Sequence, residues 1–309
     1  MEAAIATNGK QRVQKIAVVT GANKGIGLET VKQLASEGIT VVLTARNEKR
    51  GMEARDLLHK KGLTNVIFHK LDVLDPISIH SLATFIKNKF GCLDILVNNA
   101  AASGTIVDEE RLRALNIDPE TWLSGKAVNM IQEVITTNYE TSELCLNTNY
   151  YGVKRVTQAL LPLLNLSSTG ARIVNVSSLR SELRRIRSEE LRNELNDIET
   201  LTEEKLDGIV ERFMQDLKEN RLEEGGWSLM LPAYSISKAT LNAYTRILAR
   251  KYPKMVINCV HPGYVNTDLN WHTGPLPVEE GAKGPVTCAL LPHEGPTCCY
   301  FDQTQVAPF

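Results

Sequence analysis

Short apolar runs alternate with amphipathic stretches through the first third of the chain. The apolar runs are rich in β-branched residues, which is typical of strands buried on both faces; they cover 16–20, 40–45, 66–68 and 93–97. Apolar residues recur at helical spacing between these runs, over 28–38, 48–61 and 75–90. This order predicts an α/β fold with a Rossmann-like, doubly wound parallel sheet and helices on both of its faces.

The alternation of strands and helices continues further along the chain. The sequence predicts a helix that ends near Leu164, a valine-rich strand over 172–176, and a helix from Tyr234 to about Tyr252. We therefore expect about seven strands in a single domain that spans residues 1–309.

Two long stretches, 102–145 and 179–232, break this pattern. The first is charged, poor in glycine and only weakly periodic, so we expect a loop with short helices. In the second, Thr202 precedes an apolar stripe from Leu206 to Leu217, which predicts a capped amphipathic helix. We expect both stretches to be insertions that form and cover a substrate pocket.

Composition and charge exclude several classes of partner. The 309 residues are 43% hydrophobic and 23% charged, and a net charge of −1 provides no basic surface for nucleic acid or for an anionic membrane. No apolar run reaches the length of a membrane span, and residues 1–15 lack the hydrophobic core of a signal peptide, so we expect a cytoplasmic protein. The six cysteines have no metal-binding spacing; we expect reduced thiols and no metal site.

A glycine-rich turn separates the first predicted strand from the first predicted helix. It reads Gly21-Ala22-Asn23-Lys24-Gly25-Ile26-Gly27. Such a turn lets backbone N–H groups and the N-terminus of the helix approach a pyrophosphate. The Gly-Lys-Ser/Thr signature of nucleoside-triphosphate loops is missing. The pattern therefore indicates a nicotinamide dinucleotide.

The residue that follows the second strand indicates which dinucleotide binds. An NAD enzyme places an acid there for the ribose 2′-hydroxyl, whereas this chain has Arg46. A guanidinium suits a 2′-phosphate, and Lys24 adds a second positive charge, so we expect NADP (NADPH) as the cofactor. The alternative is that Arg46 only begins a loop. Asp72, which precedes Val73 after the third strand, is a candidate acceptor for the adenine amino group, or a plain turn residue.

Tyr234 and Lys238 lie one turn apart on one face of a predicted helix. At this spacing the ammonium can lower the pKa of the phenol and make it a usable proton donor. The pair alone also fits a half-buried tyrosine beside a solvated lysine. Ser177 and Ser178 follow the strand over 172–176, where a hydroxyl can point into a ligand crevice.

With these residues the chain resembles the short-chain dehydrogenase/reductase family over nearly its full length. The matching motifs are, in order, Thr20 to Gly27, Asn98 to Ala100, Asn149, Asn175 to Ser178, Tyr234 with Lys238, and Pro262 to Thr267. Within the family the chain is similar to the plant subgroup of salutaridine reductases and neomenthol (menthone) dehydrogenases, which is related to carbonyl reductase. The subgroup's markers are Asn23 to Gly27, the segment around Asn149 and a long insertion before Tyr234.

The resemblance implies roles for individual residues. Tyr234 is the expected proton donor, Lys238 the cation that stabilises the phenolate and binds the nicotinamide ribose, and Ser178 the donor to the substrate oxygen. Ser177 is the rival of Ser178, and Asn149 is expected to hold a water that links Lys238 to solvent. The expected cofactor contacts are Gly21, Asn23, Lys24, Gly25, Ile26, Gly27, Arg46, Asp72, Val73, Asn98, Ala100, Tyr234, Lys238, Pro262, Gly263, Val265 and Thr267.

The implied activity is NADPH-dependent reduction of the ketone of a bulky apolar molecule, such as a monoterpenoid or an alkaloid. Apolar surface for it is available, with core packing as the alternative, from Trp227, Leu229, Met230, Leu231 and Trp271. His261 and His272 are expected to be structural.

Two other functions stay open. Some members of the subgroup reduce a conjugated C=C bond, but they tend to lack the active-site tyrosine. A non-catalytic, cofactor-binding regulator is the third hypothesis.

The insertion before Tyr234 resembles a helical cover over the surface by which other members oligomerise, so we expect a monomer.

Overall fold

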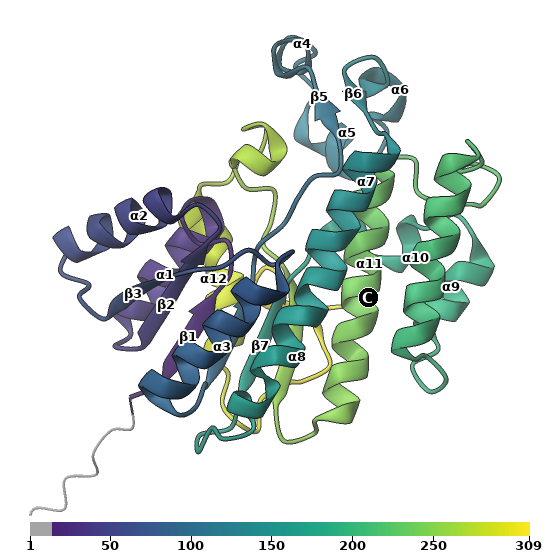
Figure 1. The fold of residues 1–309 in the computed structure, drawn as a ribbon. Coiled ribbons are helices and arrows are strands. Elements are labelled where there is room, and N and C mark those ends of the chain that lie inside the picture. The colour runs from purple at the N-terminus through teal and green to yellow at the C-terminus, as the bar shows by residue number, and fades with distance from the viewer. Residues whose placement is uncertain (1–13) are drawn as a thin grey trace, which may run out of the picture.

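Helices cover both faces of a central sheet, and most of its strands are therefore fully buried (Figure 1). The computed structural model describes residues 14–309. The strands of the sheet are β1 (Ile16–Val19), β2 (Thr40–Ala45), β3 (Val66–Lys70), β4 (Ile95–Asn98), β7 (Arg172–Val176), β8 (Val256–His261), β9 (Tyr300–Asp302) and β10 (Gln305–Ala307).

The strand order is β10-β9-β8-β7-β4-β1-β2-β3, and the chain reverses its direction of travel across the sheet between β1 and β4. Seven strands are parallel, which confirms the predicted doubly wound architecture. The eighth, β10, pairs antiparallel with β9 at one edge and was not predicted. The carboxyl ends of the parallel strands share one edge of the sheet.

Each face of the sheet has its own hydrophobic core. One core includes residues of α1 (Gly25–Ser36), α2 (Glu48–Lys60) and α12 (Val278–Leu290). The other includes residues of α3 (Pro76–Phe90), α7 (Tyr139–Leu146), α8 (Gly152–Leu164) and α11 (Pro232–Lys251). A π-helical turn, η1 (Asn147–Tyr151), joins α7 to α8.

The stretch 102–145 contains the expected short helices, α4 (Glu109–Ala114), α5 (Pro119–Ser124) and α6 (Val128–Ile131). It also contains an antiparallel pair that was not predicted, β5 (Ile106–Val107) with β6 (Ile135–Thr136). These elements protrude beyond α7 in Figure 1. Trp122 and Ile131 form a small core there with Trp271 from the loop after β8. The stretch therefore packs against the segment that follows the last long strand.

The stretch 179–232 begins with two short 3-10 turns, η2 (Leu179–Ser181) and η3 (Leu183–Arg185), and continues with α9 (Glu189–Asn196) and α10 (Glu203–Lys218). Thr202 caps α10, because its hydroxyl accepts from the Lys205 amide at 3.2 Å, as predicted. The predicted apolar stripe, from Leu206 to Leu217, faces the core that α7, α8 and α11 share: its residues up to Phe213 are buried there, and Met214 and Leu217 pack against it partly buried. Figure 1 shows α9 and α10 beside α11.

A buried ion pair fastens α10 to α8. Both carboxylate oxygens of Asp207 accept from the Lys154 ammonium at 2.9 Å, and one of them also accepts from the Tyr150 hydroxyl at 2.8 Å. Glu203 lies 3.5 Å from the same ammonium. Because the side chain of Lys154 is only 11% exposed, its charge depends on these carboxylates for compensation.

Two absences hold for residues 14–309. None of the helices there combines the length with the apolar character that crossing a bilayer needs. No cluster of three or more His, Cys, Asp or Glu side chains with metal-binding geometry occurs in that part of the chain. The six cysteines all carry free thiols. The expectation of no signal peptide concerns residues that lie almost entirely outside the described part.

Asp207→Ala should lower the free energy of unfolding by about 1–3 kcal/mol, because it leaves the Lys154 ammonium and the Tyr150 hydroxyl without their shared acceptor. Urea unfolding followed by circular dichroism measures the change. Glu211→Ala, which removes an exposed charge from the same helix, is the control and should change stability by less than about 0.5 kcal/mol. Equal effects of the two substitutions would contradict the fastening role of Asp207.

Candidate active site

A long cleft opens where β1, β2, β3 and β4 end and α1 begins. It includes about 1720 Å³ of empty space, counted with its opening to solvent. Its lining brings together most of the residues predicted to bind the cofactor, namely Gly21, Asn23, Lys24, Gly25, Ile26, Gly27, Arg46, Asp72, Val73, Ala100 and Thr267. The cleft therefore lies at the point where the strand order reverses, which is where doubly wound sheets bind their ligands.

The glycine turn needs residues without a side chain. Gly21 has a φ of +62°, and a Cβ on it would lie 2.8 Å from the Cα of Ala100. A Cβ on Gly27 would lie 2.4 Å from Nδ2, the side-chain amide nitrogen of Asn99. The turn therefore packs directly against the segment that follows β4.

The N-terminus of α1 faces this cleft without a side-chain cap. Lys24 occupies the N-cap position, and its side chain makes no capping hydrogen bond. The first N–H groups of α1 are thus available to an anion, and the positive end of the helix dipole adds to the attraction. Arg46 is exposed at the far end of the same cleft. These features fit a dinucleotide with an additional phosphate.

Asn98 lines neither this cleft nor the neighbouring cavity. Its amide donates to Asn175 at 2.9 Å and to Thr157 at 3.2 Å inside the core, because alternation along β4 turns it away from the cleft. The side chain of Asn98, which we expected on the adenosine side, is therefore directed into the core. Asn99 lies in the cleft instead, and its amide donates to the carbonyls of Thr20 and Gly21.

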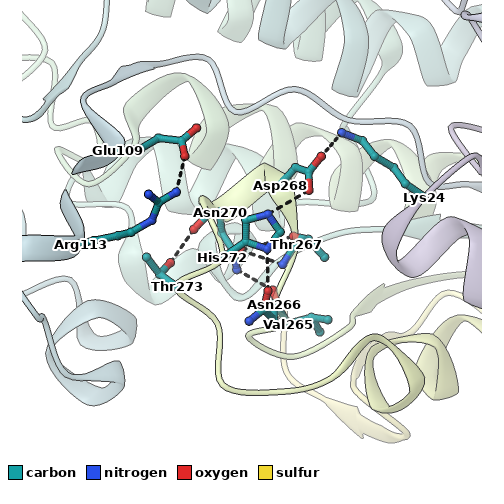
Figure 2. A network of polar contacts seen from close by, with 10 residues as sticks. All are labelled: Lys24, Glu109, Arg113, Val265, Asn266, Thr267, Asp268, Asn270, His272 and Thr273. Carbon is teal, nitrogen blue, oxygen red and sulfur yellow. Dashed lines mark hydrogen bonds and ion pairs between the residues drawn. The ribbon is translucent and has the colours of Figure 1, made fainter. Parts of the chain in front are cut away.

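An ion pair spans the mouth of the cleft (Figure 2). The ammonium of Lys24, in the glycine turn, pairs with Asp268 from the loop after β8. The hydrogen bond from Lys24 is the main reason why the pKa of Asp268 is lowered. Both side chains are more than half exposed, so this pair contributes little to stability.

His272 supports Asp268 from the other side. Its Nε2 lies 3.1 Å from the Asp268 carboxylate, and its Nδ1 is hydrogen-bonded to the Asn266 side chain at 2.7 Å. This pairing of a histidine with a carboxylate was not predicted from the sequence. These two contacts lie within the loop 266–272, and Asp268 links that loop to the glycine turn through Lys24.

A second, more enclosed cavity adjoins the cleft. It shares Ile26, Ser103, Thr267 and Leu269 with the cleft and holds about 690 Å³ of empty space, its mouth included. Most of its lining is apolar or aromatic. The predicted residues Ser178, Tyr234, Leu231, Pro262, Gly263, Val265 and Trp271 all border it.

The phenol of Tyr234 and the hydroxyl of Ser178 meet at the wall of this cavity. The two side chains border the same cavity, although Ser178 follows β7 and Tyr234 lies in the first turn of α11, and the interaction with Ser178 acts to lower the pKa of the phenol. The hydroxyl of Ser177 is committed elsewhere, since it donates to Asn242 at 2.6 Å in the core. Both candidate serines border the cavity, but the Ser177 hydroxyl is donated to Asn242, and of the two it is Ser178 that acts on Tyr234.

Lys238 lies beneath Tyr234. Its ammonium is 5.6 Å from the centroid of the Tyr234 ring and donates to the carbonyl of Val176 at 2.7 Å. Burial lowers the pKa of Lys238 to about 8. The lysine is therefore still mostly protonated at neutral pH.

The pKa of Tyr234 is raised to about 12, chiefly because the phenol is desolvated; the hydrogen bond from Ser178 and the charge of Arg180 act in the opposite direction. This differs from the expectation that Lys238 would lower it below the usual value. Desolvation of a neutral acid opposes its ionisation, and here it outweighs the nearby charges. At neutral pH the phenol therefore keeps its proton and can donate it.

Asn149 occupies the π-helical turn η1, a feature that often marks functional sites. Its amide nitrogen donates to Ala102 O and to the Ser237 hydroxyl, both at 3.0 Å, and its oxygen accepts from the Ala102 amide at 2.8 Å. These bonds hold the segment after β4 against the helix that carries Lys238. The side chain of Asn149 makes no contact with Lys238 in this arrangement.

Several cavity residues were missed by the reading of the sequence. Trp122 stacks on Tyr264 with 6.2 Å between ring centroids and meets Trp271 edge to face. Arg180 is buried beside them. Nothing in the sequence marks Trp122, Tyr264 and Arg180 as neighbours, because they come from three separate segments that only tertiary packing brings together. His261 also lines the cavity; burial lowers its pKa to about 4, so the ring is neutral.

Part of the apolar surface expected near the pocket lies elsewhere. Trp227 is buried against Phe213 and donates to the Asp216 carboxylate at 2.8 Å, so it belongs to the core of the insertion. Leu229 and Met230 border a separate surface crevice. Only Leu231 and Trp271 of the expected set line the cavity that holds Tyr234.

Comparison with known proteins agrees with this geometry. Residues 15–188 match the family model for the short chain dehydrogenase. The chain is 52% identical to short-chain dehydrogenase/reductase 1 of Saponaria officinalis, with 96% of each chain covered. It is 49% identical to (+)-neomenthol dehydrogenase of Arabidopsis thaliana, with 97% of this chain and 99% of that protein covered.

Among solved structures, salutaridine reductase from Papaver somniferum superimposes with a TM-score of 0.87 at 46% identity, and the match covers 94% of this chain and 99% of that one. The family, the fold and the plant subgroup inferred from the motifs are thus confirmed. The protein belongs to the short-chain dehydrogenase/reductase family and is an oxidoreductase.

Proposed function

We propose that the protein is an NADPH-dependent carbonyl reductase that acts on the ketone of a bulky apolar small molecule, with Tyr234 as the proton donor. The observation that carries this proposal is the placement of Tyr234 and Ser178 together on the wall of the cavity next to the dinucleotide cleft. A carbonyl at that place has a donor for its oxygen and an adjoining cleft for the cofactor.

A bound NADPH supplies the hydride, with its electron pair, to the carbonyl carbon. The hydroxyls of Tyr234 and Ser178 hold the carbonyl oxygen, and Tyr234 gives its proton to that oxygen as the C=O double bond becomes a C–O single bond. The product is an alcohol, and Tyr234 is left as a phenolate. The Lys238 ammonium stabilises this phenolate electrostatically.

Reprotonation of Tyr234 then restores the acid. We propose Lys238 as the immediate source of charge stabilisation and a water near Asn149 as the link to solvent. The bonds from Asn149 to Ala102 and Ser237 support a positioning role, because they fix the helix turn next to Lys238.

Tyr234 favours carbonyl reduction over C=C reduction, since an alkoxide oxygen needs a proton donor at this place.

The choice of NADPH rests on the charges at the far end of the cleft. Arg46 follows β2 and lies exposed in the cleft, and Lys24 reaches the same cleft from the glycine turn. A guanidinium can bind a 2′-phosphate through two parallel hydrogen bonds. The pairing of Lys24 with Asp268 leaves Arg46 as the stronger candidate for this contact.

The substrate class follows from the cavity. Trp122, Tyr264 and Trp271 give it broad aromatic walls, which suit an apolar small molecule. The relatives named for neomenthol and salutaridine suggest a monoterpenoid or alkaloid ketone.

We propose a single domain over residues 1–309, in the cytoplasm, with the two insertions forming the wall and cover of the pocket.

Tyr234→Phe should lower the turnover of ketone reduction by about 10²–10⁴-fold, the usual range for loss of a general acid, while NADPH binding is retained. Turnover is measured by NADPH consumption, and binding by the change in nicotinamide fluorescence. Tyr252→Phe, at the other end of the same helix, is the control and should keep its rate. An unchanged rate in Tyr234→Phe would remove this residue from the reaction.

Arg46→Ala should raise the KM for NADPH by about 10–100-fold, because it removes a charge-assisted contact with the 2′-phosphate. The KM for NADH, which has no such phosphate, should change far less. Steady-state kinetics with both cofactors measures the difference, with Arg55→Ala on α2 as the control. Equal weakening of the two cofactors would count against the phosphate contact.

The protein should be a monomer, because α10 covers the outer face of α7 and α11 that is otherwise free for association. Light scattering coupled to gel filtration at micromolar concentration should give a mass near 34.3 kDa. A mass of about twice this value would show that the insertion does not prevent dimer formation.

A further inference from the structure

Arg180 is a buried arginine at the centre of the substrate region. It lies two residues after Ser178, in the turn η2, and is only 5% exposed. Arg180, Tyr234 and Tyr264 line the same cavity, and the charge of Arg180 acts against the rise in the pKa of both phenols. The residue therefore stands beside the reacting group, yet the reaction proposed above assigns no task to it.

Among residues 14–309 no carboxylate lies within ion-pair distance of the Arg180 guanidinium, although the charge of Glu182 acts on it from further away. Nη2 of Arg180 donates a hydrogen bond to the carbonyl of Trp122. A guanidinium has five N–H donors, and a buried charge is costly when it is not compensated. An anion that enters from outside the chain would relieve that cost.

The neighbouring arginines differ from Arg180 in this respect. Arg184 and Arg185 both pair with Glu182 at 2.9 Å. Arg187 pairs with Glu223 at 3.1 Å. Their charges are compensated within the chain, so Arg180 is the arginine of this group that is left to bind an external group.

Arg180 also connects two hollows. It lines the cavity that holds Tyr234, and it lines a second crevice on its other side. The lining of that crevice includes four arginines, Arg180, Arg184, Arg185 and Arg187, together with Ser124 and Ser228. Glu182 and Glu223 supply two negative charges against these four guanidinium groups, so the crevice keeps an excess of positive charge.

Gly125 borders this crevice beside the guanidinium. A Cβ on Gly125 would lie 3.5 Å from Nη1 of Arg180, an ordinary van der Waals contact, so this part of the chain packs against the nitrogen without crowding it. Burial lowers the pKa of Arg180 to about 10, and the group therefore stays charged at neutral pH. A positive group is thus held at the boundary between an apolar cavity and a basic crevice.

We propose that Arg180 and the arginine-lined crevice form an anion subsite for the substrate, so that the preferred ketone carries an oxyanion, a carboxylate or a phosphate ester, at the end remote from its carbonyl. The apolar body of such a molecule fills the cavity of Trp122 and Tyr264, and its oxyanion accepts from the Arg180 guanidinium. This inference rests on the proposed carbonyl reduction and narrows its substrate class.

Matched pairs of ketones test the proposal with the full chain and NADPH. The probes are 4-oxocyclohexanecarboxylate and 4-(4-oxocyclohexyl)benzoate, each against its neutral methyl ester, and 4-oxocyclohexyl phosphate against its neutral dimethyl ester. For at least one pair, kcat/KM should favour the anion by about tenfold or more, because the anion makes charge-assisted hydrogen bonds that its ester lacks. Whether carboxylate or phosphate is preferred identifies the oxyanion.

Variants assign the preference to a residue. Arg180→Met should reduce the anion-to-ester ratio to near one, and Arg180→Lys, which keeps the charge without the planar fork, should retain part of it. Arg221→Met removes a surface arginine outside both hollows and should leave the ratio as in the parent protein. Circular dichroism shows whether each variant is folded; if Arg180→Met is not, Arg180→Lys carries the test.

Three results would overturn the proposal: equal use of anion and ester by the parent protein in every pair, an unchanged ratio in the Arg180 variants, or an equal loss for anion and ester, which would make Arg180 merely structural.

If no ketone is reduced at all, the proposed function fails on its own. The subsite is then decided by quenching of tryptophan fluorescence with the benzoate probe and inorganic phosphate. Saturable binding that Arg180→Met weakens about tenfold supports it; no binding, or binding that is equal in both proteins, overturns it.

Discussion

The common direction of the seven parallel strands is the constraint on which the site depends. Because these strands end at one edge of the sheet, segments far apart in the sequence meet there: the glycine turn after β1, Arg46 after β2, and Ser178 after β7. Asp268, in the loop after β8, pairs with Lys24 of the glycine turn and so brings this loop to the same edge. The cleft and the cavity proposed for cofactor and substrate are adjacent for the same reason, since both are bordered by the ends of neighbouring strands.

Burial sets the chemistry at this edge. Tyr234 and Lys238 are both desolvated, and desolvation raises the pKa of the neutral acid to about 12 while it lowers that of the cation to about 8. The two effects leave a protonated phenol above a largely protonated ammonium at neutral pH. The proposed reaction needs a proton donor and a positive charge for the resulting phenolate, and these two protonation states would supply both. The bond from Lys238 to the Val176 carbonyl keeps the ammonium in place.

Periodicity and motif spacing were sufficient for the fold and for residues whose role depends on local chain geometry. The glycine turn, Arg46, Ser178 and the Thr202 cap all lie where their neighbours in sequence place them. Contacts between distant segments could not be predicted in this way: Lys24 with Asp268, Trp122 on Tyr264, and the isolated Arg180 depend on how two insertions pack. Asn98 was misplaced because one step along a strand turns a side chain to the opposite face. The raised pKa of Tyr234 escaped prediction because burial cannot be read from a four-residue spacing.

The most direct test of the account follows the hydrogen atoms. The protein is given NADPH that carries deuterium at both C4 positions together with a cyclic enone such as isopiperitenone, and the product is analysed by mass spectrometry and NMR. The account predicts one deuterium on the carbinol carbon of an allylic alcohol, with the hydroxyl proton derived from solvent through Tyr234. Deuterium on the β-carbon of a saturated ketone, or no transfer to any ketone substrate, would contradict it.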